Sequence, residues 1–307
     1  MHSWRNGTEK QYSPHIKNWL LFCKEAKIDP CVDNVPHALE YLSDLFEKGS
    51  SYDKIKTARS ALSTIIAPIN NLTFGRLPIV KRFMKGVFER RPTFPRNLFI
   101  WDVSILFDHF RSLPVVEELP LKTLSKKLAI LMSLASGGQR VQTLHRIELE
   151  NIHFLNDRVI IPITSLIKQS RPSRHMALLV FKTFDENKLC VVQHLTCYLK
   201  MTENRRTTQK LFIGYVKPFK AVSRDTISRW CKTMLSEAGI DTKHYTSHSS
   251  RSAAPSKSKS GIPIKEILKN AGWSNERTFA TRYDKTVIED INLLNILNNG
   301  NGHNTDE

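Results

Sequence analysis

The sequence predicts a mostly helical protein with one small antiparallel β-sheet, in two domains. Amphipathic stretches with apolar residues three and four positions apart recur along the chain, as in helices that pack on one face. Only residues 156–163 and 174–181 resemble strands. The segment "RRPTFPRN", residues 90–97, holds two prolines and three arginines, which neither a helix nor a central strand tolerates. We therefore expect domains over residues 1–94 and 95–307.

Four helices are expected in the first domain, over residues 13–28, 34–49, 50–66 and 77–92. The third should bury one apolar stripe, namely Tyr52, Ile55, Ala58, Ala61, Leu62 and Ile65. The fourth should bury another, namely Val80, Phe83, Met84, Val87 and Phe88.

The opposite faces of the third and fourth helices are cationic. The outward residues are Lys54, Lys56 and Arg59, followed by Lys81, Arg82, Lys85, Arg90 and Arg91. A charged face is usually only a solvated face, but two such faces in one small domain suit the phosphate backbone of DNA. Arg96, in the segment after them, would run along the same DNA.

The second domain should consist mainly of helices around a small sheet. Amphipathic helices are expected over residues 101–113, 121–138, 222–240 and 287–297, and the second of these should end at Gly137 and Gly138. The two strands would be joined by "TSLIKQSRPS", a cationic segment rich in turn-forming residues.

Charge narrows the class of partner. The chain carries 46 Lys and Arg against 29 Asp and Glu, a formal charge of +17. A basic soluble surface is the plain interpretation, but an excess of this size usually indicates a polyanion, with nucleic acid first and an anionic membrane second. No apolar run of membrane-spanning length occurs and the first residues lack a secretory signal, so membrane insertion is not expected.

The five cysteines are odd in number and include no Cys-x-x-Cys pair, which favours a reducing intracellular location over a disulfide framework. Cys190, His194 and Cys197 would share one helix face. Their apolar neighbours favour ordinary packing over a metal site, and no metal or other cofactor is expected.

The stretch "HYTSHSSRSAAPSKSKSG", residues 244–261, is polar and offers little to a hydrophobic core. His248 and Arg251 lie one helical turn apart in it, on a helix that Thr246 or Ser247 would cap. An imidazole, a guanidinium and a helix N-terminus would then converge, as in a site for an anion.

Four further residues are candidates for the same site, although each has a plainer interpretation when taken alone. Arg140 follows a double glycine, Lys168 occupies the strand connection, Trp273 lies in a turn, and Tyr283 follows Phe279 by one helical turn. A lysine in a turn usually serves solubility, and a tyrosine at a helix end usually packs there.

The order Arg140, Lys168, His248-x-x-Arg251, Trp273 and Tyr283 resembles the catalytic set of the tyrosine recombinases, the phage integrase superfamily. Four segments most resemble the sequences of recombinases of DIRS-like and Ngaro-like retrotransposons, namely "ASGGQRVQTL", "WDVSILFDHF", "KQSRPS" and "SRSAAPSKSKSGIPIKEILKNAGWS". The resemblance covers nearly the whole chain. It implies a helical, SAM-like core-binding domain followed by a tyrosine recombinase catalytic domain.

The resemblance also implies a role for each residue. Tyr283 would attack a DNA phosphodiester and form a 3′-phosphotyrosyl bond, without ATP or a metal ion. Arg140 and Arg251 would clamp the phosphate oxygens. Lys168 would be the general acid, His248 would assist proton transfer or hold the phosphate, and Trp273 would donate its indole N–H.

Three positions depart from the family pattern. Thr143 stands where an acidic residue often follows the arginine, so something else must hold Arg140. Ser252 replaces a common histidine, and the spacing from Trp273 to Tyr283, 10 residues (283 minus 273), is one longer than in many relatives. Tyr245 is an alternative nucleophile, and Arg174 and Lys182 are alternatives to Lys168.

The implied partner is double-stranded DNA, with a homotetramer assembled on paired sites through exchange of the apolar C-terminal helix, residues 287–297. The expected activity is site-specific cleavage and rejoining for integration of a mobile element. A type IB topoisomerase activity and an inactive or domesticated DNA-binding protein are the alternatives. Function alone would place the protein in the nucleus of a eukaryote, or otherwise inside the cell with DNA.

Overall fold

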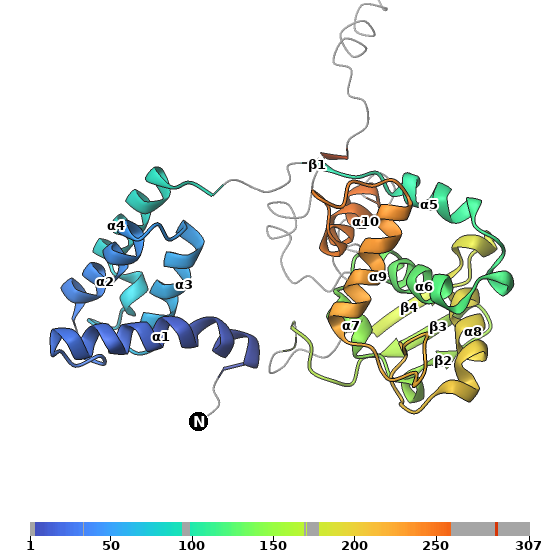
Figure 1. Cartoon of the computed structure of the whole chain (residues 1–307), viewed down its shortest axis with the longest axis horizontal. Coiled ribbons are helices and arrows are strands. Elements are labelled where there is room, and N and C mark those ends of the chain that lie inside the picture. Colours follow the sequence, from blue (N-terminus) through green and yellow to red (C-terminus); the bar gives the residue numbers. More distant parts are fainter. Residues whose placement is uncertain are drawn as a thin grey trace, which may run out of the picture. The chain divides into compact units, whose positions relative to one another are not determined.

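The structure is a computed structural model that describes residues 4–32, 34–93, 99–168, 170, 178–258 and 286–287. The chain forms two compact units, Met1–Arg96 and Asn97–Glu307, each with its own hydrophobic core (Figure 1). The described residues are mostly helical with one three-stranded antiparallel sheet, so the predicted fold class is confirmed. Among these residues, no helix is long and apolar enough to cross a membrane.

The described residues of the first unit form four helices and one short 3-10 turn: α1 (Asn6–Ala26), α2 (Val35–Glu47), α3 (Tyr52–Leu62), η1 (Phe74–Arg76) and α4 (Pro78–Arg90). Ser51 caps α3 by accepting a hydrogen bond from the Lys54 backbone N–H, and Pro78 supplies the first residue of α4. Trp19 is fully buried, and the centre of its ring lies 5.6 Å from the centre of the Tyr41 ring in an edge-to-face arrangement. α1 begins at Asn6, which is seven residues earlier than the sequence predicted.

Two predictions of the direction in which a side chain points are wrong, one for Phe88 of α4 and one for Arg91, the C-cap residue of α4. Phe88 is 42% exposed and only touches the edge of the Tyr52 ring, because Val80, Met84 and Val87 already fill the core at helical spacing. Arg91 does not point outward. It lies over the Phe46 ring and donates hydrogen bonds to the backbone oxygens of Phe46 and Ser50.

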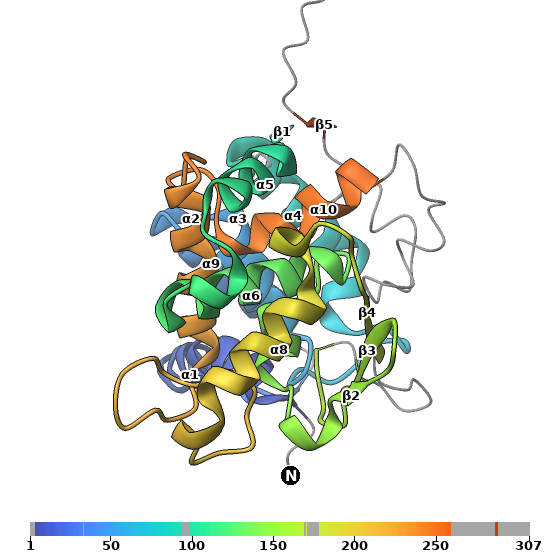
Figure 2. The same cartoon turned by 90° about the vertical axis from the view of Figure 1, so that its right-hand side faces the viewer.

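The second unit begins with β1 (Phe99–Ile100) and α5 (Val103–Ser112) and continues through many short elements. These are η2 (Val116–Glu118), α6 (Leu121–Ala135), α7 (Val141–His145), η3 (Leu149–Asn151), β2 (His153–Phe154), β3 (Arg158–Pro162), β4 (Leu178–Lys182), η4 (Asn187–Leu189), α8 (Val191–Thr202), η5 (Glu203–Arg205), α9 (Arg224–Glu237), η6 (Ser247–Ser249), α10 (Ser250–Ser258) and β5 (Thr286–Val287). α6 is the central helix and contacts α8, α9 and α10 (Figure 2). Every side chain of α6 from Leu124 to Leu134 is buried.

The burial of α6 includes two lysines. Lys126 forms an ion pair with Glu237 of α9 at 2.6 Å. Lys127 is fully buried, with its Nζ 5.2 Å from the centre of the Phe110 ring and 3.4 Å from the Phe110 backbone oxygen. Burial lowers the pKa of Lys127 to about 8, because the charged ammonium is poorly solvated there.

The sheet has the order β2-β3-β4, and the predicted antiparallel pair is confirmed, with Ile160 opposite Val180. Val159, Ile161, Leu179 and Phe181 point into the core, as period-two alternation requires. The sequence did not predict β2, which has two residues, or the parallel pair of β1 with β5. The helix predicted over residues 287–297 does not begin at Val287, because that residue lies in β5, and residues 288–297 lie outside the described residues.

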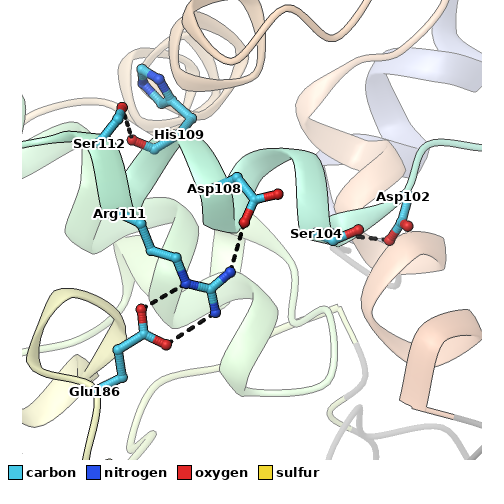
Figure 3. Close-up of polar contacts among 7 residues, drawn as sticks. All are labelled: Asp102, Ser104, Asp108, His109, Arg111, Ser112 and Glu186. Carbon is cyan, nitrogen blue, oxygen red and sulfur yellow. Dashed lines mark hydrogen bonds and ion pairs between the residues drawn. The ribbon is translucent and has the colours of Figure 1, made fainter.

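A surface ion-pair network ties α5 to the loop before α8 (Figure 3). The Arg111 guanidinium donates to both carboxylate oxygens of Glu186, at 2.8 and 3.0 Å, and to Asp108 at 2.7 Å. Hydrogen bonding to Arg111 lowers the pKa of the Glu186 carboxyl. At the other end of α5, Asp102 caps the helix by accepting a bond from the Ser104 backbone N–H (Figure 3).

The packing interpretation of Cys190, His194 and Cys197 is confirmed. His194 is fully buried and its Nδ1 bonds the Cys190 backbone oxygen at 2.8 Å, while Cys197 Sγ contacts the Val116 oxygen. In the part of the chain that the structure describes, no group of His, Cys, Asp and Glu side chains could hold a metal ion.

Acid should destabilise the protein through His194. Burial, reinforced by the charge of Lys127, lowers its pKa to about 4, so the folded state binds fewer protons than the unfolded state. The stability that neutral His194 contributes is complete above pH 6.5 and is lost as the pH falls toward 4, approaching about 3 kcal/mol at about 1.4 kcal/mol per pKa unit. Urea unfolding from pH 7 to 4 should show a shallower decline for His194→Gln than for the wild type. The exposed substitution His153→Gln is the control, and equal slopes for His194→Gln and the wild type would contradict the prediction.

Candidate active site

The site begins at the C-terminal end of α6, where the chain reverses through two glycines. The backbone N–H of Gly137 donates to the Leu134 oxygen and that of Gly138 to the Ser133 oxygen, both at 2.9 Å. Both glycines have left-handed backbones, with φ of 72° and 81°. This is the Schellman arrangement that ends helices, and it confirms the predicted helix stop.

Gly138 lies directly against the backbone of Arg251. A Cβ atom at Gly138 would be 2.7 Å from Arg251 Cα and 3.0 Å from the Arg251 backbone oxygen. Arg251 NH1 donates a hydrogen bond to the Gly138 oxygen at 3.0 Å. Because Arg140 is only two residues from Gly138, this contact joins the segments that carry two of the arginines selected from the sequence.

Hydroxyl groups reinforce the junction between the end of α6 and the start of α10. Ser133 Oγ lies 3.3 Å from Ser250 Oγ and 3.2 Å from the Gln139 backbone oxygen. All three of these residues are buried, so the contacts are shielded from water. The turn that carries Arg140 and the helix that carries Arg251 are therefore joined at several points.

The polar stretch at residues 244–258 does contribute to the core, contrary to expectation. Arg251 is 2% exposed, and Ala253 and Ala254 of α10 pack into the main cluster. Small serines and alanines permit this because they let α10 approach α6 closely. Thr246 caps η6 by accepting from the His248 backbone N–H at 3.3 Å, as predicted, and His248 itself is exposed.

Arg140 is the N-cap residue of the short helix α7 and is partly exposed. Its backbone oxygen accepts from Thr143 and Leu144, and its Nε is buried with no hydrogen-bond acceptor among the described residues. Thr143 is buried and donates to Gln139 Oε1 at 3.3 Å. Thr143 stands where the family often has a carboxylate, and it forms a neutral hydrogen-bonded pair with Gln139.

Lys168 is exposed on a turn that two buried neighbours anchor. The Ser170 backbone N–H donates to the Ile167 oxygen, and Ser170 Oγ accepts from the Ile167 N–H, both at 3.0 Å. Ile167 and Ser170 are 3% and 4% exposed, so the turn is attached to the core while Lys168 points outward. Its alternative Lys182 is exposed at the end of β4, and Arg174 lies outside the described residues.

The structure therefore joins the segments that carry Arg140 and Arg251, and His248 lies three residues before Arg251, whereas Lys168 is on a separate turn. Trp273, Tyr283 and Arg96 lie outside the described residues. Tyr245, the alternative nucleophile, is partly buried against the core, and burial raises the pKa of its hydroxyl. A raised pKa makes the phenol harder to ionise.

Sequence reasoning missed the structural role of Gly138 as the contact point with Arg251. It also missed Trp101, whose Nε1 donates to Ser249 Oγ at 2.8 Å. The double glycine was visible as a helix stop, but nothing in the local sequence connects residue 138 with 251 or 101 with 249.

On the first unit, the structure leaves Lys54 and Lys56 of α3 and Lys81, Arg82 and Lys85 of α4 exposed. Lys85 forms only a loose ion pair with Glu89, at 3.7 Å. Arg59 differs, because its guanidinium is half-buried beside Gly75. Arg90 is exposed as well, so six of the eight cations selected on the two helices are exposed, and only Arg59 and Arg91 are not.

Comparison with known proteins identifies the class. The pattern described as the phage integrase family matches residues 115–287, which is more than half of the chain. The chain therefore belongs to the phage integrase family, the tyrosine recombinases. A search of the curated proteins found no match.

Solved structures of recombinases have a similar fold. A lambda integrase dimer bound to a COC′ core site is 15% identical with a TM-score of 0.55, over 100% of this chain and 93% of that one. The Tn1549 transposon integrase in complex with circular intermediate DNA is 14% identical with a TM-score of 0.58, over 92% and 91%. The XerH recombinase bound to its difH substrate is 14% identical with a TM-score of 0.55, over 81% and 69%.

Proposed function

We propose that this chain is a site-specific DNA recombinase that cleaves and rejoins duplex DNA through a 3′-phosphotyrosyl intermediate. Family membership supports the reaction class. The observation that supports the assignment to residues is the contact of Gly138 with Arg251, which joins the turn that carries Arg140 to the helix that carries Arg251. Two guanidinium groups on such adjoining segments suit a single phosphate.

In the proposed step, the Tyr283 oxygen attacks the phosphorus of a DNA phosphodiester. The new bond joins tyrosine to the 3′-phosphate while the bond to the 5′-oxygen breaks, and Lys168 donates the proton that this oxygen takes up. His248 assists removal of the tyrosine proton or holds the phosphate, and Trp273 donates its N–H to it. Attack of the 5′-hydroxyl on the phosphotyrosine reverses the step, so neither ATP nor a divalent ion is required.

The arginines supply the electrostatic part of catalysis. Arg140 and Arg251 hold the non-bridging oxygens, whose negative charge grows in the pentacoordinate transition state. Preorganised donors of this kind contribute about 3 to 4 kcal/mol each. Burial fixes the position of the Arg251 guanidinium before DNA binds, which limits the reorganisation needed during the reaction.

Duplex DNA is the proposed substrate and partner, bound by the helical first domain as well as by the catalytic domain. Lys54, Lys56, Lys81, Arg82 and Lys85 are exposed, as contacts with DNA phosphates require. We extend the proposal to integration of a DIRS-like or Ngaro-like mobile element, which the resemblance of the motif sequences to such recombinases supports. Exchange of the predicted apolar helix that would follow β5, within residues 288–297, would assemble a homotetramer on two paired sites, and a eukaryotic host would place it in the nucleus.

Covalent trapping tests the proposal. The protein is incubated without metal with end-labelled nicked duplexes from the terminal repeats of the element that encodes it. A nick beside the cleavage site lets the short leaving strand diffuse away, so the covalent complex accumulates. The wild type should give an SDS-resistant protein–DNA adduct, and Tyr283→Phe should give none while binding the same duplex equally well.

The other outcomes separate the alternatives. Steep salt-dependent binding without any adduct would contradict the proposal and favour a DNA-binding protein that has lost activity. An adduct accompanied by relaxation of supercoiled plasmid, with no joining of two sites, would favour a type IB topoisomerase activity.

A further inference from the structure

Residues 99–101 connect two parts of the catalytic unit that are distant in sequence. Phe99 and Ile100 of β1 pair in parallel with Thr286 and Val287 of β5, and the two strands lie side by side in both views (Figures 1 and 2). The next residue, Trp101, donates from its indole Nε1 to Ser249 Oγ at 2.8 Å. β5 begins three residues after Tyr283 in the sequence, and Ser249 directly follows His248.

Both sides of the Trp101–Ser249 bond are well anchored. Ile100 is fully buried and Trp101 is 4% exposed, so the indole has little freedom to move. Ser249 Oγ donates its own hydrogen to the Thr246 backbone oxygen at 2.6 Å and therefore receives the indole N–H with a lone pair. These two bonds fix the 3-10 turn that presents His248 and leads into the helix of Arg251.

Among the described residues, Trp101 is the donor to Ser249 Oγ, and the Thr246 oxygen is the acceptor of its hydrogen. Loss of the indole N–H would therefore release one side of the turn. The hydrogen bond spans 148 positions and joins the first residues of the second unit to its polar site. Such a long connection is not required to form η6 itself, because Thr246 already caps that turn locally.

We propose that Trp101 is a positioning residue for DNA cleavage, acting through Ser249 to hold His248 in the orientation that the reaction needs. This inference rests on the proposed function. Trp101 does not contact the phosphate in this account, and its effect reaches the reacting atoms only through the η6 turn. Misplacement of a catalytic group by about 1 Å can slow a reaction by about 100-fold.

The test compares single-turnover cleavage of the nicked duplex by four variants. Trp101→Phe keeps an aromatic ring in the pocket but removes the donor, and Ser249→Ala removes the acceptor. Each should lower the cleavage rate about tenfold, the effect of one well-formed hydrogen bond, while duplex affinity changes little and the melting temperature falls by only a few degrees. The double variant should be no slower than either single one, and Ser249→Thr, which keeps the hydroxyl, should restore most of the rate.

A second cycle asks whether Trp101 acts through His248. In a His248→Ala background, Trp101→Phe should cause no further loss of rate. Equal loss in both backgrounds, or a wild-type rate for Trp101→Phe, would overturn the proposal. If the wild-type protein itself forms no adduct, the proposed function fails, and that result is distinguishable from a wild-type adduct that Trp101→Phe leaves undiminished.

Discussion

Replacement of Gly138 with alanine is expected to disrupt the turn that joins Arg140 to Arg251 and to abolish DNA cleavage. A Cβ atom would meet Arg251 Cα at 2.7 Å, and backbone atoms cannot move aside as a flexible side chain can. The left-handed backbone costs an L-residue about 1 to 2 kcal/mol, and overpacking adds about 1 to 3 kcal/mol. Urea unfolding measures the stability, and the trapping assay measures cleavage.

Gly239→Ala is the matched control for the substitution at Gly138. Gly239 has nearly the same backbone conformation, with φ of 82°, but nothing lies within 4 Å of its Cβ position. Gly239→Ala should therefore lose only the stability that the left-handed backbone costs, about 1 to 2 kcal/mol, and keep its cleavage activity. Equal losses of stability and of cleavage in the two variants would show that the contact with Arg251 is unimportant.

Arg140→Ala should lower the single-turnover cleavage rate by about 100- to 1,000-fold, which is the usual effect of removing one preorganised donor from a transition state. Duplex affinity should fall only slightly, because one of many phosphate contacts is lost. Arg140 is partly exposed, so the melting temperature should change little. Arg140→Lys should recover only a small part of the rate, since an ammonium cannot donate two parallel hydrogen bonds to one phosphate.

Arg146→Ala is the control for the charge removed at Arg140. Arg146 is the C-cap residue of the same short helix and is also partly exposed. Arg146→Ala removes the same charge from the same region and so measures the effect of the overall electrostatic field alone. We expect cleavage by this variant to stay within about threefold of the wild type. A similar large loss in both variants would contradict a specific role for Arg140.

Local patterns were sufficient to predict most helices and the β3–β4 pair. The stripe Ile55, Ala58 and Leu62 identified α3, and the double glycine identified the end of α6. These signals depend on residues close together in sequence, where helical periodicity and capping act. The one large error of this kind was the start of α1, where few strongly apolar residues precede Trp19 to mark the first two turns.

Long-range packing was the part that sequence could not provide. The β1–β5 pair joins two-residue segments nearly 190 positions apart, with no pattern in either to indicate a partner. Arg91 has the composition of a solvated residue, yet backbone oxygens at the end of α2 and just after it draw it inward. The burial of Lys127 likewise depends on Phe110 and the helices around α6 rather than on its own helix.

For the candidate site, residue types and spacing selected Arg140, His248 and Arg251 as candidates, but they did not predict the environment of these residues. The stretch at residues 244–261 was expected to offer little to a hydrophobic core, whereas its small side chains let Arg251 lie buried against Gly138. A serine- and alanine-rich helix is ambiguous in sequence because the same small residues suit a solvated surface and a close helix contact. Only the partner, here the end of α6, decides between them.

The identity of the residue that joins to DNA is the central claim, and the most direct measurement is mass spectrometry of the trapped adduct after digestion with nuclease and protease. The proposed function predicts a nucleotide attached to the peptide that contains Tyr283. A nucleotide attached to the peptide that contains Tyr245, or to any other residue, would contradict it.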